Sequence, residues 1–373
     1  MSEAQTIPLP RETGELVGHQ AAESAMAEAV ASGKIPHAWL ITGPSGIGKA
    51  TLAYRFARHI LSGAGAAEDE GPGLFGDALP ATPAGLHVPR DNPVFSQIAA
   101  GSHPDMLVVE RGYDEKRKKM RGEIVIDDVR QIGSFLRLTP SLGGWRVVVL
   151  DSADEMNRNA ANAVLKLLEE PPRQALLLLV SHAPGRLLPT IRSRCRAVRL
   201  GPLSDAQVAE LLAKHLPELD QATSETLVAL SEGSIGRALS LAAEGGIDAL
   251  RELFRALESY PQIKDLAVLE LADKWTRATK AEETDPFETG TALLDWWLGR
   301  IARDAASGDR PVDRVPGMGA AAEKLAAALG PAGIAERRAV ISAMLGRGSR
   351  LSLDKRQMLM DAFQLLAPDH AGS

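Results

Sequence analysis

Short, almost purely apolar stretches recur through the first 200 residues of the chain. Their length suits a strand better than a helix, and strands that are apolar on both faces are typical of a buried parallel sheet. We therefore predict five parallel strands, at Trp39–Thr42, Asp105–Glu110, Trp145–Asp151, Ala175–Val180 and Ala197–Leu200.

Stretches with apolar residues at helical spacing alternate with these strands. They cover Gly18–Ser32, the residues after Thr51, Ile124–Leu136 and Arg158–Glu170, and Pro171-Pro172 ends the last of them. Alternating strands and helices predict an α/β core in which helices flank a parallel five-stranded sheet.

The pattern changes near Gly201-Pro202. From there to the end of the chain only helical spacing is found, with Trp296-Trp297 inside one of several apolar stripes. Two polar stretches, 277–290 and 304–319, predict loops between these helices, and Val340 is assigned to the apolar face of another. This part of the chain is therefore predicted to be all-α, with the stripes forming a helix-bundle core.

One loop of the α/β region carries recognisable chemistry. It joins the first strand to a helix, and it has the spacing G-x-x-x-x-G-K of a phosphate-binding loop. Glycines let the backbone curl and aim its N–H groups inward, while the lysine would reach the terminal phosphates of a nucleotide. The candidate nucleotide-binding residues are Gly43, Pro44, Ser45, Gly46, Ile47, Gly48, Lys49, Ala50 and Thr51.

Two positions depart from the pattern of a working ATPase. Ala50 stands where a Ser or Thr hydroxyl would hold Mg²⁺, and Thr51 points about 100° away around the helix. Asp151 ends a strand where an acid helps to hold Mg²⁺, but Ser152 follows it in place of a carboxylate. Losing a positioned base costs about 10²–10⁴ in rate, so we expect weak binding of ATP or ADP, poorly held Mg²⁺ and little hydrolysis.

A turn at Pro189–Cys195 is the second candidate for chemistry. Arg192 and Arg194 make it either a basic surface turn or a place where an arginine is presented to a neighbouring subunit. A guanidinium supplied in trans to a transferring phosphoryl group can be worth about 10³–10⁵ in rate. Cys195 itself is interpreted as a small buried residue.

Composition and charge exclude several classes of protein. The net charge of −6 argues against a protein that grips nucleic acid by overall positive charge; the basic run Lys116–Lys119 is either a solvated loop or a contact for DNA or a partner. Cys195 is the only cysteine, so neither an intrachain disulfide nor a cysteine-based zinc site can form. No apolar stretch approaches the ~20 residues of a membrane span and no signal-peptide pattern is found, so we expect a cytoplasmic protein without membrane contact.

Four motifs together resemble the delta-prime subunits of the bacterial DNA polymerase III clamp loader, members of the AAA+ class. They are the phosphate loop, Asp151–Asn157, Asn159–Pro172 and Ser193-Arg194-Cys195, and the segment Ile98–Asp105 is similar too. The resemblance covers about residues 16–240. It implies a flexible N-terminal arm at 1–15, an AAA+ α/β domain at 16–201 with a flexible insertion at 62–91, a helical lid at 202–246 and a helical collar for oligomerisation at 247–373.

The resemblance also assigns residues to roles. Arg194 would be the catalytic arginine finger that this subunit lends in trans to the ATP site of its neighbour. Arg237, in a motif resembling the sensor-2 signature of the lid, would approach any bound phosphate. Ser181 stands at the sensor-1 position without the usual Thr or Asn. The four-cysteine zinc module of many relatives is absent, so no zinc is expected.

The resemblance implies a place in a larger assembly. The chain would be a stator of a five-subunit ring within a DNA-directed DNA polymerase holoenzyme, with the gamma/tau motor subunits and the delta subunit as partners, and with the sliding clamp and primer–template DNA contacted through the complex. The alternative is an ATP-hydrolysing motor subunit of the same class, which Ala50 and Ser152 disfavour. A small-molecule kinase would leave the Ser-Arg-Cys turn and the helical region unexplained.

Overall fold

The computed structural model describes residues 7–63, 85–114, 119–142, 144–277, 285–308, 318–351 and 353–368. The chain divides into two compact units, residues 1–211 with 232–236 and residues 212–231 with 237–373. The domain boundaries inferred above, at 201/202 and 246/247, stay predictions. Within the described ranges, no helix combines the length and the apolar character that crossing a bilayer requires.

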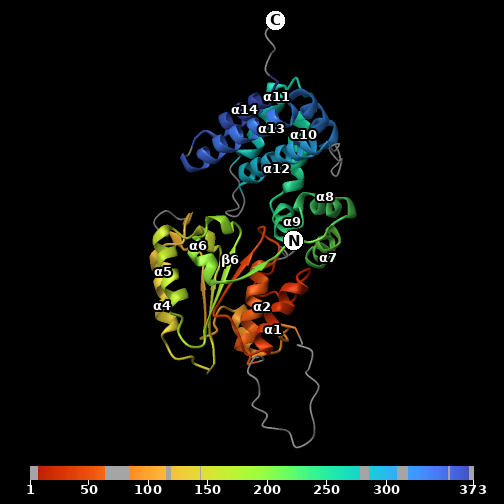
Figure 1. Cartoon of the computed structure of the whole chain (residues 1–373). Coiled ribbons are helices and arrows are strands. Elements are labelled where there is room, and N and C mark those ends of the chain that lie inside the picture. The colour runs from red at the N-terminus through yellow and green to blue at the C-terminus, as the bar shows by residue number, and fades with distance from the viewer. Residues whose placement is uncertain are drawn as a thin grey trace, which may run out of the picture. The chain divides into compact units, whose positions relative to one another are not determined.

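Five parallel strands form the sheet of the first unit, in the order β2-β5-β6-β1-β7 (Figure 1). The predicted α/β core with a parallel five-stranded sheet, followed by helices, is confirmed. The central strand β6 is buried along its whole length, which explains why its sequence is continuously apolar. The strands are β1 (Ala38–Thr42), β2 (Met106–Val109), β5 (Arg146–Leu150), β6 (Ala175–Ser181) and β7 (Arg196–Arg199).

Helices cover both faces of this sheet (Figure 1). The helices α1 (Gln20–Ala31) and α2 (Lys49–Leu61) bury Met26, Leu52 and Phe56 against one face. Three others pack on the opposite face through residues such as Val129, Val164 and Ile191. These are α4 (Ile126–Leu136), α5 (Arg158–Glu169) and α6 (Pro189–Arg194), while the shorter α3 (Pro93–Ala99) follows the long insertion.

The register of β1 and β7 fixes where the two candidate sites lie. Trp39 is paired with Arg196 and Thr42 with Arg199. Because the strands are parallel, the phosphate loop after Thr42 lies at their carboxyl ends. Arg194 precedes β7 and therefore lies at their amino ends. The two candidate sites therefore lie at opposite ends of the strands. Each residue of β1 adds about 3.3 Å to the distance between them.

Part of the predicted N-terminal arm is tied to α2. The Arg58 guanidinium donates to the carbonyl oxygens of Arg11 at 3.0 Å and Thr13 at 2.6 Å, and Arg55 donates to that of Gly14. Residues 1–6 lie outside the described residues, as do 64–84 of the predicted insertion; Leu86, at its far end, is buried in the core.

A small antiparallel hairpin stands apart from the main sheet and was not predicted. It consists of β3 (Tyr113–Asp114) and β4 (Lys119–Met120). Two residues are too short a stretch for a hydrophobic alternation to be read in the sequence, so the missed strands have a simple reason.

The second unit is helical, as predicted, but two of its predicted loops were drawn too wide. Residues 286–307 form one continuous helix, and the next begins at Met318. The Asp285 side chain accepts the N–H of Phe287 at 3.1 Å, Pro286 takes the first helical position, and Gly308 ends the helix with a φ of 74°. Val340 is 48% exposed, so its assignment to the core was wrong.

The remaining helices of the chain complete the architecture. Gly330, with a φ of 65°, interrupts α13 and divides it into two helical stretches. The helices are α7 (Asp205–His215), α8 (Gln221–Ser231), α9 (Ile235–Ala243), α10 (Gly246–Leu257), α11 (Asp265–Trp275), α12 (Pro286–Ser307), α13 (Met318–Leu351) and α14 (Lys355–Leu366).

Candidate functional site

The phosphate loop has the backbone that its glycines predict. Gly43, Gly46 and Gly48 all have positive φ, at 148°, 72° and 101°. A Cβ atom on Gly43 would lie 2.4 Å from the carbonyl oxygen of Leu200, just after β7. Glycine is therefore required at this position both for conformation and for space.

Four successive carbonyl groups of the loop each meet a donor from the same unit. Pro44 O accepts from Lys49 Nζ; the Ser234 hydroxyl donates to Ser45 O at 2.8 Å, the Gly236 N–H to Gly46 O at 2.9 Å, and His19 Nε2 to Ile47 O at 2.7 Å. In a planar trans peptide the N–H points away from the C=O of the same unit. The N–H groups of residues 45–48 are therefore turned away from these donors, the arrangement that an anion-binding nest requires.

Lys49 is almost completely buried, with 3% of its surface exposed. Burial lowers the pKa of its ammonium group to about 8, while the nearby carboxylates of Asp151 and Asp154 act in the opposite direction. Its amine donates to the carbonyl of Pro44 in its own loop. The group is thus charged at neutral pH but close to titration, and it can exchange the carbonyl for a phosphate oxygen.

The residues present fit a polyphosphate better than they fit Mg²⁺. Ala50 offers a methyl group at the second position of α2, where no oxygen is available for a metal. Asp151 uses Oδ1 to accept the N–H of Ser152 at 2.7 Å. Asp154 likewise accepts the backbone N–H of His182, and the Ser152 hydroxyl lies beside His182 Nε2. With Ala50 in place of a hydroxyl, these groups are a poor set of ligands for an ion that demands octahedral oxygen coordination.

His182 is a candidate residue that the sequence analysis missed. Ser152 has a φ of 54°, and its hydroxyl lies 3.1 Å from His182 Nε2. Because β5 and β6 are neighbours, residues just beyond their carboxyl ends meet, and this adjacency is the signal that could have found the pair. Among the described residues no partner is found for His182 Nδ1, so no carboxylate orients this imidazole as in a catalytic triad.

Ser181 is fully buried at the end of β6. Burial alone would raise the pKa of Asp154, but the Ser181 hydroxyl and the backbone N–H of His182, 2.9 Å from Oδ1, stabilise the carboxylate and hold its pKa below the ordinary value. Asp154 therefore fixes the backbone that carries Ser181 and His182.

Arg237 is engaged within the second unit. Its guanidinium lies 5.5 Å from the centre of the Trp296 ring on α12, within cation–π distance. Its predicted approach to a bound phosphate stays a prediction, since the phosphate loop belongs to the first unit.

Arg194 lies at the exposed end of α6. Its Nη1 donates to the carbonyl of Thr190 at 3.0 Å, and its Nη2 lies 2.9 Å from Oε1 of Glu169, the last residue of α5. Cys195 is half-buried against the core beneath, and burial raises its pKa to about 11, so it is not a nucleophile.

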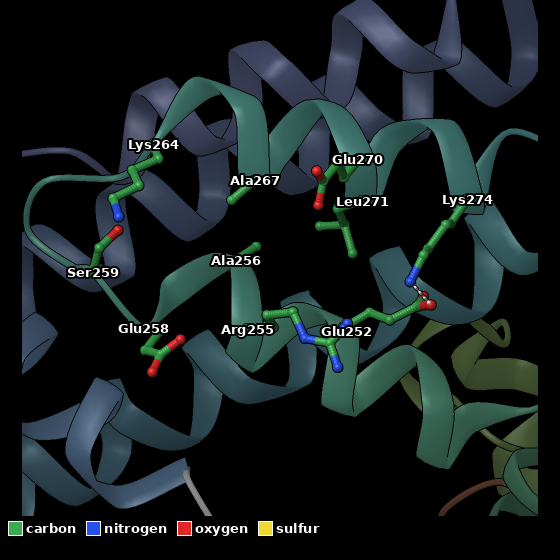
Figure 2. Close-up of a pocket in the computed structure, with 10 residues that line it drawn as sticks. All are labelled: Glu252, Arg255, Ala256, Glu258, Ser259, Lys264, Ala267, Glu270, Leu271 and Lys274. Atoms are coloured by element: carbon green, nitrogen blue, oxygen red, sulfur yellow. Dashed lines mark ion pairs between the residues drawn. The ribbon is translucent and has the colours of Figure 1, made fainter.

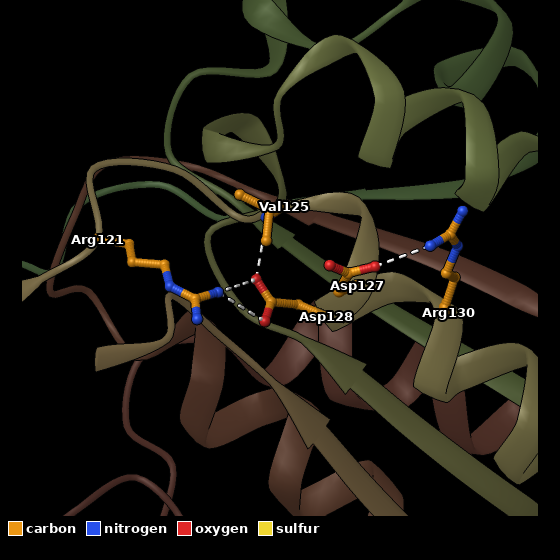
Figure 3. A network of polar contacts seen from close by, with 5 residues as sticks. All are labelled: Arg121, Val125, Asp127, Asp128 and Arg130. Carbon is orange, nitrogen blue, oxygen red and sulfur yellow. Dashed lines mark hydrogen bonds and ion pairs between the residues drawn. The ribbon is translucent and has the colours of Figure 1, made fainter. Parts of the chain in front are cut away.

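The basic run beside the hairpin lies largely outside the described residues, and its contact with DNA stays a prediction. The nearest described cation, Arg121, is held by Asp128 of α4 at 3.3 Å (Figure 3). The same carboxylate accepts the N–H of Val125 at 2.9 Å, which caps the helix.

A hollow of about 360 Å³ lies between α10 and α11 in the second unit (Figure 2). Acids and bases alternate around it, with Lys274 Nζ 2.9 Å from Glu252 Oε1. Such self-compensating charges offer no catalytic arrangement. The charged groups around the hollow are Glu252, Arg255, Glu258, Lys264, Glu270 and Lys274.

Comparison with known proteins identifies the family. A family model described as DNA polymerase III, delta subunit, matches residues 88–204. DNA polymerase III subunit delta′ of Pseudomonas aeruginosa is 36% identical over 264 residues, covering 70% of this chain and 71% of that protein. Subunit delta′ of Escherichia coli is 32% identical over 61% of this chain and 60% of its own length. Subunit tau of Escherichia coli is 28% identical over 62% of this chain but only 32% of its own length. The chain therefore belongs to the family of DNA polymerase III subunit delta′.

Proposed function

We propose that the chain is the delta-prime subunit of a DNA polymerase III clamp loader, a stator that helps to load the sliding clamp onto primed DNA. In this role it donates Arg194 to the ATP site of a neighbouring motor subunit of the gamma/tau type. The delta subunit is a further partner, and clamp and primer–template DNA are met through the complex.

One observation carries this proposal: Arg194 and the phosphate loop lie at opposite ends of the parallel strands β7 and β1. An arginine at the amino ends of the strands cannot serve the chain's own nucleotide site at the carboxyl ends. In a ring built head to tail, one edge of each subunit meets the opposite edge of the next. An exposed arginine at that edge is therefore suited to a site on a neighbour.

The chain's own nucleotide site supports a stator and not a motor. Ala50 cannot ligate Mg²⁺, and Lys49 already has a partner inside its loop. ATP or ADP would bind through the loop N–H groups and Lys49, weakly and with little hydrolysis. Calorimetry with and without Mg²⁺ tests this; tight Mg²⁺-dependent binding would contradict it.

The donated arginine is tested in a reconstituted loader that contains Arg194→Ala. We expect assembly to be unchanged and ATP hydrolysis to fall by at least about 10³-fold at the site that the arginine serves, the lower end of the range for such residues. Arg192→Ala is the matched control, since Arg192 is exposed on the same short helix. Hydrolysis at an unchanged rate with Arg194→Ala would rule out the donated arginine.

The alternative, an ATP-hydrolysing motor, has one observation in its favour. The Ser152–His182 pair provides a basic group near the place where a motor has its carboxylate. If the isolated chain hydrolysed ATP near 1 s⁻¹, within the ordinary range of enzymes, and His182→Gln abolished that turnover, the motor would be the better assignment.

A further inference from the structure

Glu169 is the acidic partner of the proposed arginine finger, and no role has been assigned to it so far. Its Oε1 lies 2.9 Å from Arg194 Nη2, while Thr190 O takes Nη1 at 3.0 Å. One contact comes from α5 and the other from the arginine's own helix. Two contacts on different nitrogens fix the plane of a guanidinium, which a single contact would leave free to rotate.

Positive charge is concentrated around Arg194, so an acidic partner is needed to keep its side chain ordered. Four arginines fall within eight residues, at 192, 194, 196 and 199, and all four are exposed. Among the described residues, Glu169 is the acid that pairs with any of them. Mutual repulsion would otherwise drive the long side chains apart and spread Arg194 over many rotamers.

Glu169 is placed unfavourably for the stability of its own helix. It is the last residue of α5, where the helix dipole presents its negative end and a carboxylate is disfavoured. Helix stability therefore does not explain its presence. The backbones that carry the two charges are fixed by the core, where Leu168 and Ile191 are buried in the same cluster.

We infer that Glu169 is a positioning residue: it holds the Arg194 guanidinium in the orientation in which it meets the phosphate of the neighbouring subunit. This inference rests on the donated-arginine function proposed above. Both side chains are partly exposed, at 36% for Arg194 and 50% for Glu169. An exposed pair is weak, but it is enough to bias the rotamers of Arg194. Because a guanidinium has five N–H donors, the contacts to Glu169 and Thr190 leave other N–H groups for the phosphate.

The test uses the complete reconstituted loader with Glu169→Gln, which keeps the shape of the side chain and removes its charge. We expect kcat for ATP to fall by about fivefold, the upper limit of what an exposed pair supplies, with KM unchanged. Glu170→Gln is the matched control, because it removes the same charge from the next, exposed residue; it should leave kcat unchanged. Adding Glu169→Gln to Arg194→Ala should cause no further loss, and the melting temperature should stay constant throughout.

The outcomes separate the two proposals. If Arg194→Ala slows hydrolysis and Glu169→Gln does not, the positioning role is wrong and the donated arginine stands. If Arg194→Ala has no effect, the proposed function itself fails. A faster loader with Glu169→Gln would show that the carboxylate restrains the arginine, and equal losses with Glu169→Gln and Glu170→Gln would show a general charge effect; either result overturns the inference.

Discussion

The phosphate loop and the segment around Arg194 lie at opposite ends of the same sheet's strands, and they are built in opposite ways. The loop is closed on the chain itself: its lysine is buried, and four of its carbonyls are taken by groups from residues as far apart as His19 and Gly236. Arg194 is exposed, and its ion pair with Glu169 is a weak surface pair. The first region holds the unit together, whereas the second is available to a partner.

The difference separates residues that stabilise the unit from residues that are available for function. The phosphate loop, which has Ala50 where a metal ligand is expected, is held in shape by hydrogen bonds from neighbouring elements. An exposed arginine contributes little to folding, which agrees with the role proposed above for Arg194 at a neighbouring subunit. Substitutions in the two regions should therefore separate stability from function.

The largest effect on stability is expected from Gly43→Ala. The new methyl group would meet the Leu200 carbonyl at 2.4 Å with a φ of 148°, so strain and overpacking together should lower the free energy of unfolding by about 3 kcal/mol or more. Urea unfolding of the full chain measures this. Gly185→Ala, which points into open space, is the control and should change stability by less than about 0.5 kcal/mol. A loss below 1 kcal/mol for Gly43→Ala would mean that the stability of the unit does not depend on the close contact between the loop and Leu200.

Nucleotide affinity should weaken about fivefold between pH 8 and pH 9, or about 1 kcal/mol, because the Lys49 amine goes from half charged to about a tenth charged over that interval. The pKa of Lys49 is lowered to about 8, so below that pH the amine is charged and ready to meet a phosphate. Above it, binding must first take up a proton, and each further pH unit reduces the affinity tenfold. Calorimetric titration with ADP in the absence of Mg²⁺ follows this. The profile should be flat for Lys49→Met, and a flat profile in the unaltered chain would exclude Lys49 as the phosphate ligand.

Ser234→Ala should cost about 1 kcal/mol of stability. The hydroxyl donates to Ser45 O at 2.8 Å from a residue that is 6% exposed, and its removal leaves a carbonyl without that donor. Thermal unfolding followed by circular dichroism is sufficient to detect this. Ser240→Ala, on the exposed side of α9, serves as the comparison. Equal melting temperatures for the two variants would show that the Ser234 hydroxyl does not stabilise the loop.

The smallest effect on stability is expected from Arg194→Ala, at less than about 0.5 kcal/mol, because exposed ion pairs contribute little. The same thermal unfolding measurement checks it. A drop in stability comparable to that of Ser234→Ala would mean that Arg194 stabilises the fold, and the contrast between the two regions would disappear.

The sequence predicts the loop and the sheet well, because both depend on local patterns. Gly43–Lys49 is recognised by spacing alone, and the apolar run at 175–180 identifies the buried central strand. The start of α12 could also have been found, since Asp285-Pro286 is a familiar helix opening. The polarity of the surrounding residues hid it.

What the sequence did not predict depends on contacts between distant residues. Ser234 is 189 residues away from Ser45, and the Ser152–His182 contact exists only because β5 and β6 are neighbours. No local pattern reports such proximity. Once the strand order is known, the residues just beyond the ends of adjacent strands are the first ones to inspect.

One of the two edge strands of the sheet, β7, has a consequence for handling the isolated protein. A bare strand edge invites addition of another chain's strand and, in time, insoluble fibrils. Here that edge carries Arg196 and Arg199, both pointing to solvent, and is only four residues long. Two copies that approached one another along β7 would meet charge repulsion before any backbone hydrogen bond could form, which should disfavour pairing of free subunits through this strand.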